Sequence, residues 1–419
     1  MQCLPPRRWF QFRLRTLLLV TLACAPLFGW CANQRSKYRR QQVAIAELVG
    51  RQLKVTIEPV GPAWLRDLVG EKLLVRVDGV EAVYHGHPGH TVSRTLLSDE
   101  FALLDDLIGL ESLKIPQATI GDEQLNHILR HTDLRGLSLG GAQPGGANWK
   151  RLAVLQDLSY LSLSSTDVDD GDFAALGKLP QMHTLLLDDT KITGLGLRSL
   201  EGRRLEDLRI SGAVNDAGLR QVGRFANLAR LFISSQDVTD AGLAQLRDLT
   251  RLTRLDLTWT SITGSGLGQL ARLTELAALN LSGSPIGQGH LQMLLQLPRL
   301  TYLSLDGTAI QDADLESMPR LEVLTELSLD ETGITDAGLA ALVNKVPALE
   351  GISFWETKVT DAGLMHLLKL PKLQSVSVDG SQVTSKGVER FKAEAAQQSQ
   401  KIEVYGNYFD DEDFEEPPR

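Results

Sequence analysis

Five of the eight histidines in this 419-residue chain lie at spacings that could bind a metal ion. His85, His87 and His90 lie in the segment H-G-H-P-G-H, and His127 and His131 are four residues apart on one face of an expected helix. Imidazole nitrogens at such spacings can ligate zinc or copper. The helical pair lacks the glutamate of the H-E-x-x-H protease motif, and a polar loop and a solvated helix face explain both groups more simply. We therefore predict no resident metal, and a metal-dependent enzyme is the least favoured alternative.

Other catalytic patterns are missing from the sequence. We find no glycine-rich phosphate loop, no nucleophile elbow, and no spacing of Ser, His and Asp that suggests a triad. The three cysteines all lie in the first 31 residues, so the remainder has neither a disulfide framework nor a cysteine-based zinc site. We predict a protein that is not an enzyme and has no catalytic residues and no cofactors.

The charge of the chain is unevenly distributed. Its 43 basic and 52 acidic residues give a net charge of −9. Eight basic residues and no acid lie in residues 1–40, so the rest of the chain has an excess of 17 acids. A body of this charge is expected to be soluble and to bind nucleic acid poorly.

A hexapeptide pattern, L-x-x-L-x-L, recurs at intervals of 23 to 25 residues. A fixed period of this length is typical of a solenoid, in which each repeat packs against its neighbours. In residues 252–275 the alternation around Leu255 and Leu257 predicts a short strand with both leucines inward. The leucines of residues 264–273 lie at helical spacing and predict a helical return segment. The first position of the pattern occurs twelve times, at Leu110, Leu134, Leu158, Met182, Leu205, Leu228, Leu252, Leu276, Leu300, Leu324, Leu349 and Leu373.

Polar residues mark the helix starts and the turns that follow the strands. T-D-A-G-L recurs at Thr239, Thr335 and Thr360, with the shorter D-A-G-L at Asp216, and Thr or Asp there can cap a helix. A hydroxyl often lies three residues after the second strand leucine, where we expect it to bond the backbones of neighbouring repeats. These hydroxyl residues are Thr166, Thr190, Thr260, Ser284, Thr308, Thr332, Thr357 and Ser381.

The combination of L-x-x-L-x-L with T-x-I-T-D-A-G-L resembles the leucine-rich repeat family. The resemblance covers residues 107–400 in about 12 repeats, and residues 140–147 depart from it and suggest an irregular rim loop. It implies an α/β solenoid, a curved horseshoe with a parallel β-sheet on the concave face and helices on the convex face. The repeats are similar to those of F-box substrate receptors and of bacterial membrane-anchored leucine-rich repeat proteins. No F-box is visible, and the N-terminal segment favours the bacterial kind.

An apolar stretch over residues 16–32 is flanked by arginine and lysine on both sides. Its 17 residues would span roughly 25 Å as a helix, so we predict a transmembrane signal anchor after a basic segment at residues 1–15. A cleaved signal peptide ending at Ala25 and lipidation of Cys24 are the alternatives. The short basic N-terminus favours a single-pass membrane protein with its repeats on the non-cytoplasmic side.

The ends of the array need cover because a terminal repeat exposes apolar surface. We expect residues 33–106 to form a juxtamembrane linker and N-terminal cap. Within it we predict a helix and a strand over residues 41–56, a helix from Pro62, and a strand near Val75. Residues 401–419 are expected to provide a closing strand and an acidic disordered tail.

Side chains between the inward leucines are expected to face solvent on the concave sheet. Two groups could bind a partner there, because arginine and aromatic residues are enriched at binding hot spots. The mid-array cluster is Arg209, Arg230, Phe232, Arg254, Asp256 and Trp259. The acidic cluster is Tyr302, Asp306, Asp330, Glu331, Trp355, Glu356 and Asp379. We predict a monomeric, non-catalytic scaffold that binds a protein or peptide ligand, the alternative being a substrate-recognition subunit of a larger enzyme complex.

Overall fold

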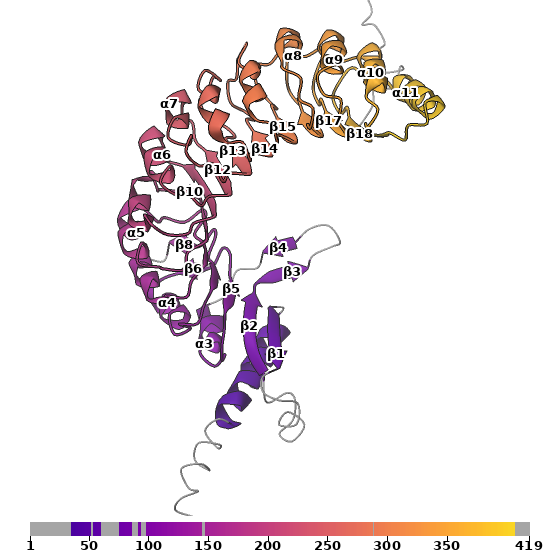
Figure 1. Ribbon diagram of the computed structural model, residues 1–419. Helices are drawn as coiled ribbons and strands as arrows, with labels where there is room; N and C mark the ends of the chain where they lie inside the picture. The colour runs from indigo at the N-terminus through magenta and orange to yellow at the C-terminus, as the bar shows by residue number, and fades with distance from the viewer. Residues whose placement is uncertain are drawn as a thin grey trace, which may run out of the picture.

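The repeats form a curved array with strands along its inner face and helices along its outer face (Figure 1). This confirms the predicted α/β solenoid. The computed structural model describes residues 35–51, 53–59, 75–85, 91–93, 98–144, 147–287 and 289–406. The predicted anchor at residues 16–32, the helix expected from Pro62 and the acidic tail lie outside these ranges. Across the described ranges, no helix has both the length and the apolar character that a bilayer span requires.

A single sheet of 15 strands runs through the array. β1 (Lys54–Pro59) and β2 (Val75–Glu81) pair in an antiparallel manner, and each later strand pairs in parallel with its neighbours. The register keeps equivalent residues side by side, so that Leu255 lies between Leu231 and Leu279. The remaining strands are β5 (Ser112–Lys114), β7 (Gly136–Ser138), β9 (Tyr160–Ser162), β10 (Thr184–Thr190), β11 (Asp207–Gly212), β12 (Arg230–Ser234), β13 (Arg254–Asp256), β14 (Ala278–Asn280), β15 (Tyr302–Ser304), β16 (Glu326–Ser328), β17 (Gly351–Ser353), β18 (Ser375–Ser377) and β19 (Glu403–Tyr405).

The twelve first-position residues of the repeat pattern are all buried, with at most 3% of their surface exposed. Leu255 and Leu257 are fully buried, which confirms the predicted strand register. One continuous hydrophobic cluster extends from Ala44 to Val404. Because full burial of a leucine contributes about 2 kcal/mol, this shared core is the main stabilising feature of the stack.

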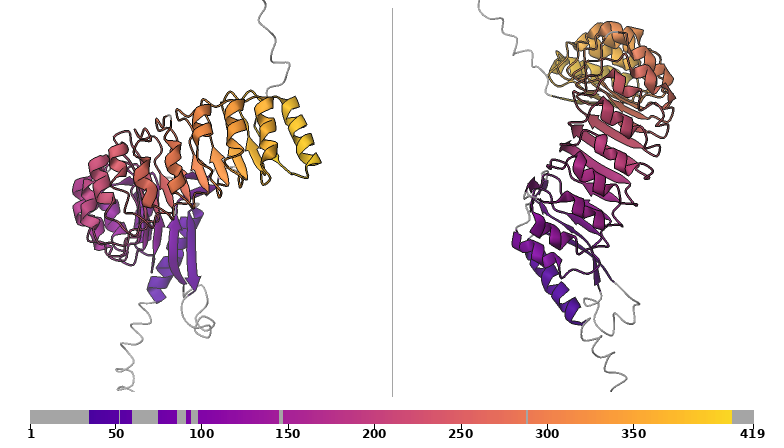
Figure 2. Two further views of the ribbon diagram at one scale, coloured as in Figure 1. Left: turned by 45° about the horizontal axis from the view of Figure 1, so that its top comes forward. Right: turned by 90° about the vertical axis from the view of Figure 1, so that its left-hand side faces the viewer.

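The outer face contains α-helices in some repeats and 3₁₀ helices in others, and Figure 2 shows them stacked side by side. The predicted helix of residues 264–273 is a 3₁₀ helix, η5 (Leu267–Arg272). Among the α-helices, α7, α9 and α10 are capped by the side chains of Thr239, Thr335 and Thr360, as predicted. The repeat 3₁₀ helices η3 to η6 have no such side-chain cap, which favours the tighter short form.

The bounds of the remaining outer-face elements follow the same order along the chain. The α-helices are α3 (Phe101–Leu104), α4 (Asp122–Ile128), α5 (Asp170–Leu176), α6 (Asp216–Val222), α7 (Asp240–Leu243), α8 (Asp312–Ser317), α9 (Asp336–Leu342), α10 (Asp361–His366) and α11 (Ser385–Gln397). The other 3₁₀ helices are η2 (Ser98–Glu100), η3 (Trp149–Val154), η4 (Leu195–Leu200), η6 (Leu291–Gln296) and η7 (Leu367–Lys369).

The hydroxyls that follow the strands are buried, but most do not bridge repeats as predicted. Thr332 donates to the carbonyl of Leu329 in its own repeat at 2.6 Å, and the other threonines of this series also bond the carbonyl three residues earlier. Ser284 is the member that bonds a neighbouring backbone, since it donates to Leu257 at 2.9 Å. The hydroxyl stem is short, so its own turn is the nearer acceptor.

A ladder between aspartate and threonine joins the helix starts of successive repeats. Asp336 accepts hydrogen bonds from the backbone nitrogen of Thr360, at 2.8 Å, and from its hydroxyl, at 2.7 Å. A Cβ at Gly363 would overlap the Asp336 carboxylate, so the glycine of T-D-A-G-L makes room for the preceding repeat. The same ladder occurs at Asp170–Thr193, Asp216–Thr239, Asp240–Thr263, Asp312–Thr335 and Asp361–Thr384.

The two ends of the array contain the predicted elements. Residues 35–50 are helical and β1 follows, as expected for residues 41–56. Gln41 is buried and ties this helix to the sheet, because its amide donates to Val75 O at 2.8 Å and accepts from Ile108 N at 2.9 Å. At the other end α11 packs Phe391 inward and β19 closes the sheet.

Candidate partner-binding surface

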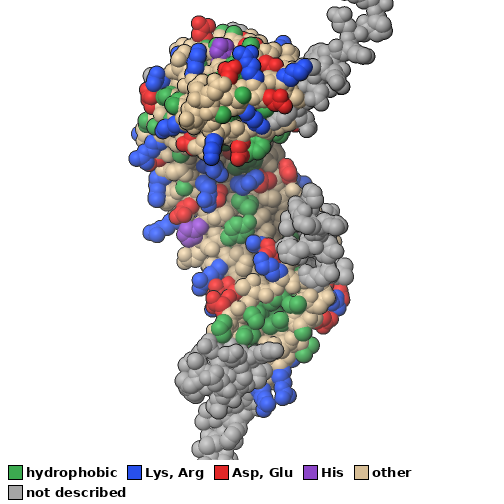
Figure 3. Space-filling model, turned by 90° about the vertical axis from the view of Figure 1, so that its right-hand side faces the viewer, with side chains coloured by type: hydrophobic (Ala, Val, Ile, Leu, Met, Phe, Trp, Pro, Cys, Tyr) green, Lys and Arg blue, Asp and Glu red, His purple; other side chains and the backbone are tan. Residues whose placement is uncertain are grey.

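The candidate partner-binding surface is the solvent face of the sheet, on the inner side of the curve. Seen from the side on which the curve opens, basic and acidic side chains are interspersed over the molecule (Figure 3). The central column of the strands is less exposed than predicted, since Ser162 and Ser304 are buried. Flat strand pairing with larger flanking side chains, such as Tyr302 beside Ser304, covers these small residues. The surface therefore offers discrete groups rather than a uniform polar sheet.

Arg209 and Phe232 of the mid-array cluster stack on one another. The guanidinium carbon of Arg209 lies 4.4 Å from the centroid of the Phe232 ring, a cation–π geometry. Its Nε donates to Asp188 at 3.1 Å, and Arg230 donates in the same way to Asp207 at 2.8 Å. Both arginines are therefore held in place over the sheet, but part of their charge is already neutralised by an acid.

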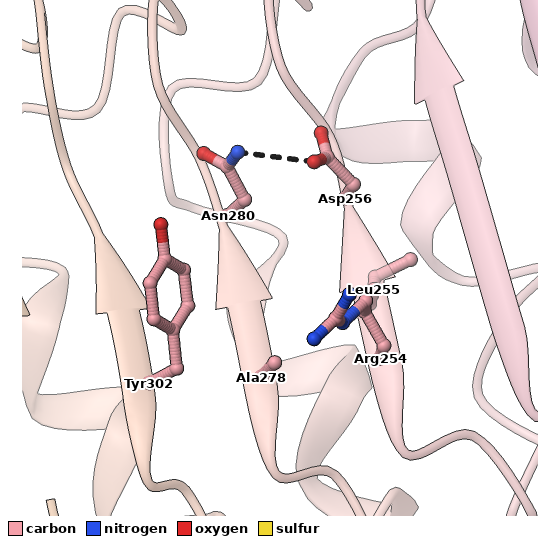
Figure 4. Close-up of a pocket in the computed structure, with 6 residues that line it drawn as sticks. All are labelled: Arg254, Leu255, Asp256, Ala278, Asn280 and Tyr302. Atoms are coloured by element: carbon pink, nitrogen blue, oxygen red, sulfur yellow. Dashed lines mark hydrogen bonds between the residues drawn. The ribbon is translucent and has the colours of Figure 1, made fainter. Parts of the chain in front are cut away.

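Arg254 differs from these two arginines because it has no ion-pair partner among the described residues. It lies on the edge of a shallow hollow of about 290 Å³, with Tyr302 on the opposite edge and Ala278 between them (Figure 4). At the far end, Asn280 donates to Asp256 at 3.0 Å. Burial raises the pKa of Tyr302, so its hydroxyl stays protonated at neutral pH. The hollow thus presents a free guanidinium, a phenol and a small apolar floor.

Two features of this hollow were not predicted. Tyr302 was assigned to the acidic cluster, but the structure places it beside Arg254. Ala278 was not selected, although it lies one repeat from each of these residues and its small side chain opens the space between them. The period of 24 residues that separates Arg254, Ala278 and Tyr302 is the sequence signal that could have found the site.

Trp259 lies at the rim of the array rather than beside Arg254. It follows β13 in a left-handed turn with φ of 56°, and 62% of its surface is exposed. The structure places it in a separate hollow with Asp189, Gly212 and Gln236. The residues of the mid-array cluster are therefore divided between the sheet and the rim.

The acidic cluster is largely bonded within itself. Asp330 accepts hydrogen bonds from the hydroxyl of Ser353 and the backbone nitrogen of Trp355, and Asp306 accepts from the backbone nitrogen of Asp330 at 3.0 Å. Burial raises the pKa of Asp330, while these hydrogen bonds act in the opposite direction. The indole of Trp355 donates to Ser377. These contacts stabilise the turns, so the cluster offers a partner less free charge than its composition indicates.

The remaining members of the acidic cluster belong to turns after the strands. Glu331 and Glu356 both have left-handed backbone conformations, with φ of 55° and 47°. Asp379 contributes its backbone, as its carbonyl accepts from Glu356 N at 2.9 Å. The structure therefore brings Asp306, Asp330 and Trp355 together and leaves the two glutamates at the rim.

The histidine groups do not form a metal site in the described part of the chain. No set of three or more His, Cys, Asp or Glu side chains there is arranged to hold an ion. His127 lies 2.9 Å from Asp105, whereas His131 lies beyond the end of α4 and is buried, so the two do not share a helix face as predicted. Burial lowers the pKa of His131. His87 and His90 lie outside the described residues, and His85 is described through its backbone in β3 (Val83–His85).

Comparisons with known proteins agree with this architecture. Residues 249–271 and 321–343 match the family described as leucine rich repeat, while a comparison with curated proteins gives no significant match. An internalin of Listeria monocytogenes is similar in fold, at 17% identity and a TM-score of 0.54, over 82% of this chain and 93% of the internalin. A leucine-rich repeat protein of Leptospira interrogans aligns at 18% identity and a TM-score of 0.38, over 74% and 93% of the two chains. The mouse RP105/MD-1 complex aligns at 18% identity and a TM-score of 0.47, over 75% of this chain and 57% of that chain.

Proposed function

We propose that this chain, which is a leucine-rich repeat protein, is a non-catalytic scaffold that binds a protein partner through the middle of its concave sheet. The repeats support this, because a solenoid presents one long surface without a deep cleft. The hollows on the sheet are shallow and lack the convergent acids, bases and nucleophiles that catalysis requires. A binding role therefore fits the geometry better than an enzymatic one.

The observation that carries the proposal is the free guanidinium of Arg254 beside Tyr302. An arginine without an internal acid can form a two-pronged hydrogen bond with a carboxylate of a partner. Arg209 and Phe232 lie two and one strands away, at a distance of about 10 Å and about 5 Å, and supply an aromatic surface for the same partner. The partner is therefore expected to present an acidic side chain next to an apolar one.

We also propose that residues 16–32 anchor the protein in a membrane, with the repeats on the non-cytoplasmic side. The support is the length of this apolar stretch and its basic flanks. The first described helix begins at residue 35, so the array would start close to the bilayer surface. Carbonate extraction of membranes tests the anchor, and protease treatment of intact cells tests the orientation. Release of the full-length chain by carbonate would exclude the anchor.

The partner site can be tested by affinity recovery from cells of the source organism, with quantification of the recovered proteins. Phe232→Ala combined with Arg254→Ala should reduce recovery of the specific partner about thirtyfold, the effect of losing about 2 kcal/mol at a hot spot. Arg224→Ala is the matched control, because this exposed arginine pairs with Glu201 beside the outer helices. Equal recovery by the double variant and the control would show that the concave site is wrong.

A further inference from the structure

A second hollow lies at the rim, where the turns follow β10 to β13, and it is separate from the partner site on the sheet. It has a volume of about 440 Å³, and polar groups form most of its lining. Asp189 stands on one side and Trp259 on the other, three strand spacings or about 14 Å apart. The hollow is thus elongated along the array and combines one large aromatic ring with several hydrogen-bonding groups.

The backbone of Trp259 is unusual for its residue type. Its φ of 56° lies in the left-handed region, which a bulky residue rarely adopts and which glycine occupies at Gly283 in the following turn. The indole lies against Gly283, where a Cβ would collide with three ring atoms, so that repeat leaves room for the ring. Because 62% of Trp259 remains exposed, the strained turn does not serve to bury the side chain. Strain that stabilises nothing inside the fold points to a role outside it.

The space beside Trp259 results from a shortened turn. Five residues separate Leu187 from Ile192, whereas four separate Ile210 from Val214 in the next repeat. Gly212 occupies this short turn with φ of 88° and has no side chain to fill the space. The floor is therefore recessed between the longer turns on either side.

The polar groups around the hollow remain available to a ligand. Gln236 and Asp237 are exposed, and their side-chain ends have no hydrogen-bond partner among the residues the structure describes. Asp189 is exposed too, and its carboxylate has one long contact, of 3.4 Å, to Ser211. Two carboxylates and one amide can accept several hydrogen bonds, and the amide can also donate.

We propose that this rim hollow binds a neutral oligosaccharide. A sugar ring has an apolar C–H face that can pack on the open face of Trp259, and its hydroxyls can donate to Asp189 and Asp237. The elongated shape favours several linked rings over a single one. The two acids disfavour sugars that carry sulfate or carboxylate groups, because like charges would meet in the hollow. A protein ligand fits less well, since the aromatic ring is isolated from other apolar surface.

The test uses the full chain in detergent and saturation-transfer NMR with chitotriose, cellotriose and maltotriose, and a heparin tetrasaccharide as the anionic comparison. At least one neutral trisaccharide should bind, and the heparin fragment should not. Trp259→Gly should weaken binding about tenfold or more, whereas Trp355→Ala, which removes another exposed rim tryptophan, should not change it. The melting temperature of Trp259→Gly should equal or exceed that of the wild type, because glycine tolerates the left-handed turn.

Failure of all three neutral sugars to bind, or binding by Trp259→Gly equal to the wild type, would overturn the proposal. Loss of melting temperature in Trp259→Gly would overturn the functional reading of the strained turn. This site is independent of the partner site on the sheet. Recovery of the protein partner should therefore be unchanged in Trp259→Gly, and sugar binding should be unchanged in Arg254→Ala.

Discussion

A single methyl group in α10 should destabilise the array because of the ladder between aspartate and threonine. In Gly363→Ala the added Cβ would overlap Oδ1 of Asp336 and lie 2.8 Å from Cγ1 of Val359. The carboxylate must then leave the position in which it accepts two hydrogen bonds from Thr360, at 2.8 and 2.7 Å. The substitution thus acts on the interface between two repeats rather than on α10 alone.

The magnitude follows from two opposing effects. A hydrogen bond to a charged acceptor contributes about 1.5–3 kcal/mol, and solvent can replace part of two such bonds, so their loss costs about 2–4 kcal/mol. Alanine is a better helix former than glycine by about 1 kcal/mol. The interface effect is larger, and we expect the free energy of unfolding to fall by about 1–3 kcal/mol.

The assay is urea denaturation of the full chain, followed by circular dichroism at the first unfolding transition. Gly287→Ala is the matched control, because no atom lies within 4 Å of its added Cβ and its φ is not left-handed. It should change stability by no more than about 0.5 kcal/mol. In an Asp336→Ala background the cost of Gly363→Ala should disappear. Equal stability of Gly363→Ala and the control would refute the ladder.

Three further predictions concern the core, the pH dependence and the surface. Leu257→Asp places a carboxylate in the fully buried spine and should cost several kcal/mol, so a melting temperature like that of the wild type would contradict the register. Burial lowers the pKa of His131, which faces Asp105, Asp133 and Arg130. The unfolded chain therefore binds the proton more readily, and stability should fall as the pH drops below about 6.5. His131→Gln should reduce that fall, and an unchanged pH profile in urea denaturation would contradict the assignment. Arg254→Ala should leave the melting temperature unchanged, because it removes no internal ion pair, and a marked decrease would mean that this arginine stabilises the fold.

The period of the leucines was enough to predict the solenoid, because residues such as Leu255 and Leu257 must face the same core in every repeat. The threonine caps at Thr239, Thr335 and Thr360 could also be predicted, since a cap is a local contact. The 3₁₀ form of η5 could not, because it depends on the lack of a cap and on close stacking of adjacent outer segments.

Contacts between repeats were the hardest to predict from the sequence. The pattern T-D-A-G-L indicates a helix start, but the need for its glycine becomes clear only when Asp336 is seen against Gly363. In the same way, the position of Trp259 relative to Arg254 depends on where the strand ends and the turn begins. Residues one period apart, such as Ala278 and Tyr302, can be aligned from the sequence, whereas the separation of sheet and rim requires the turn conformations.

The most direct test of the central claim is site-specific photocrosslinking within a single repeat. A photoreactive amino acid is placed at Ala278, on the concave sheet, or at Met293, an exposed residue of η6 on the outer face. Irradiation in cells of the source organism should give a defined crosslinked partner from position 278, and this product should disappear when Arg254 is replaced by alanine. Equal or stronger crosslinking of that partner from position 293 would contradict binding by the concave sheet.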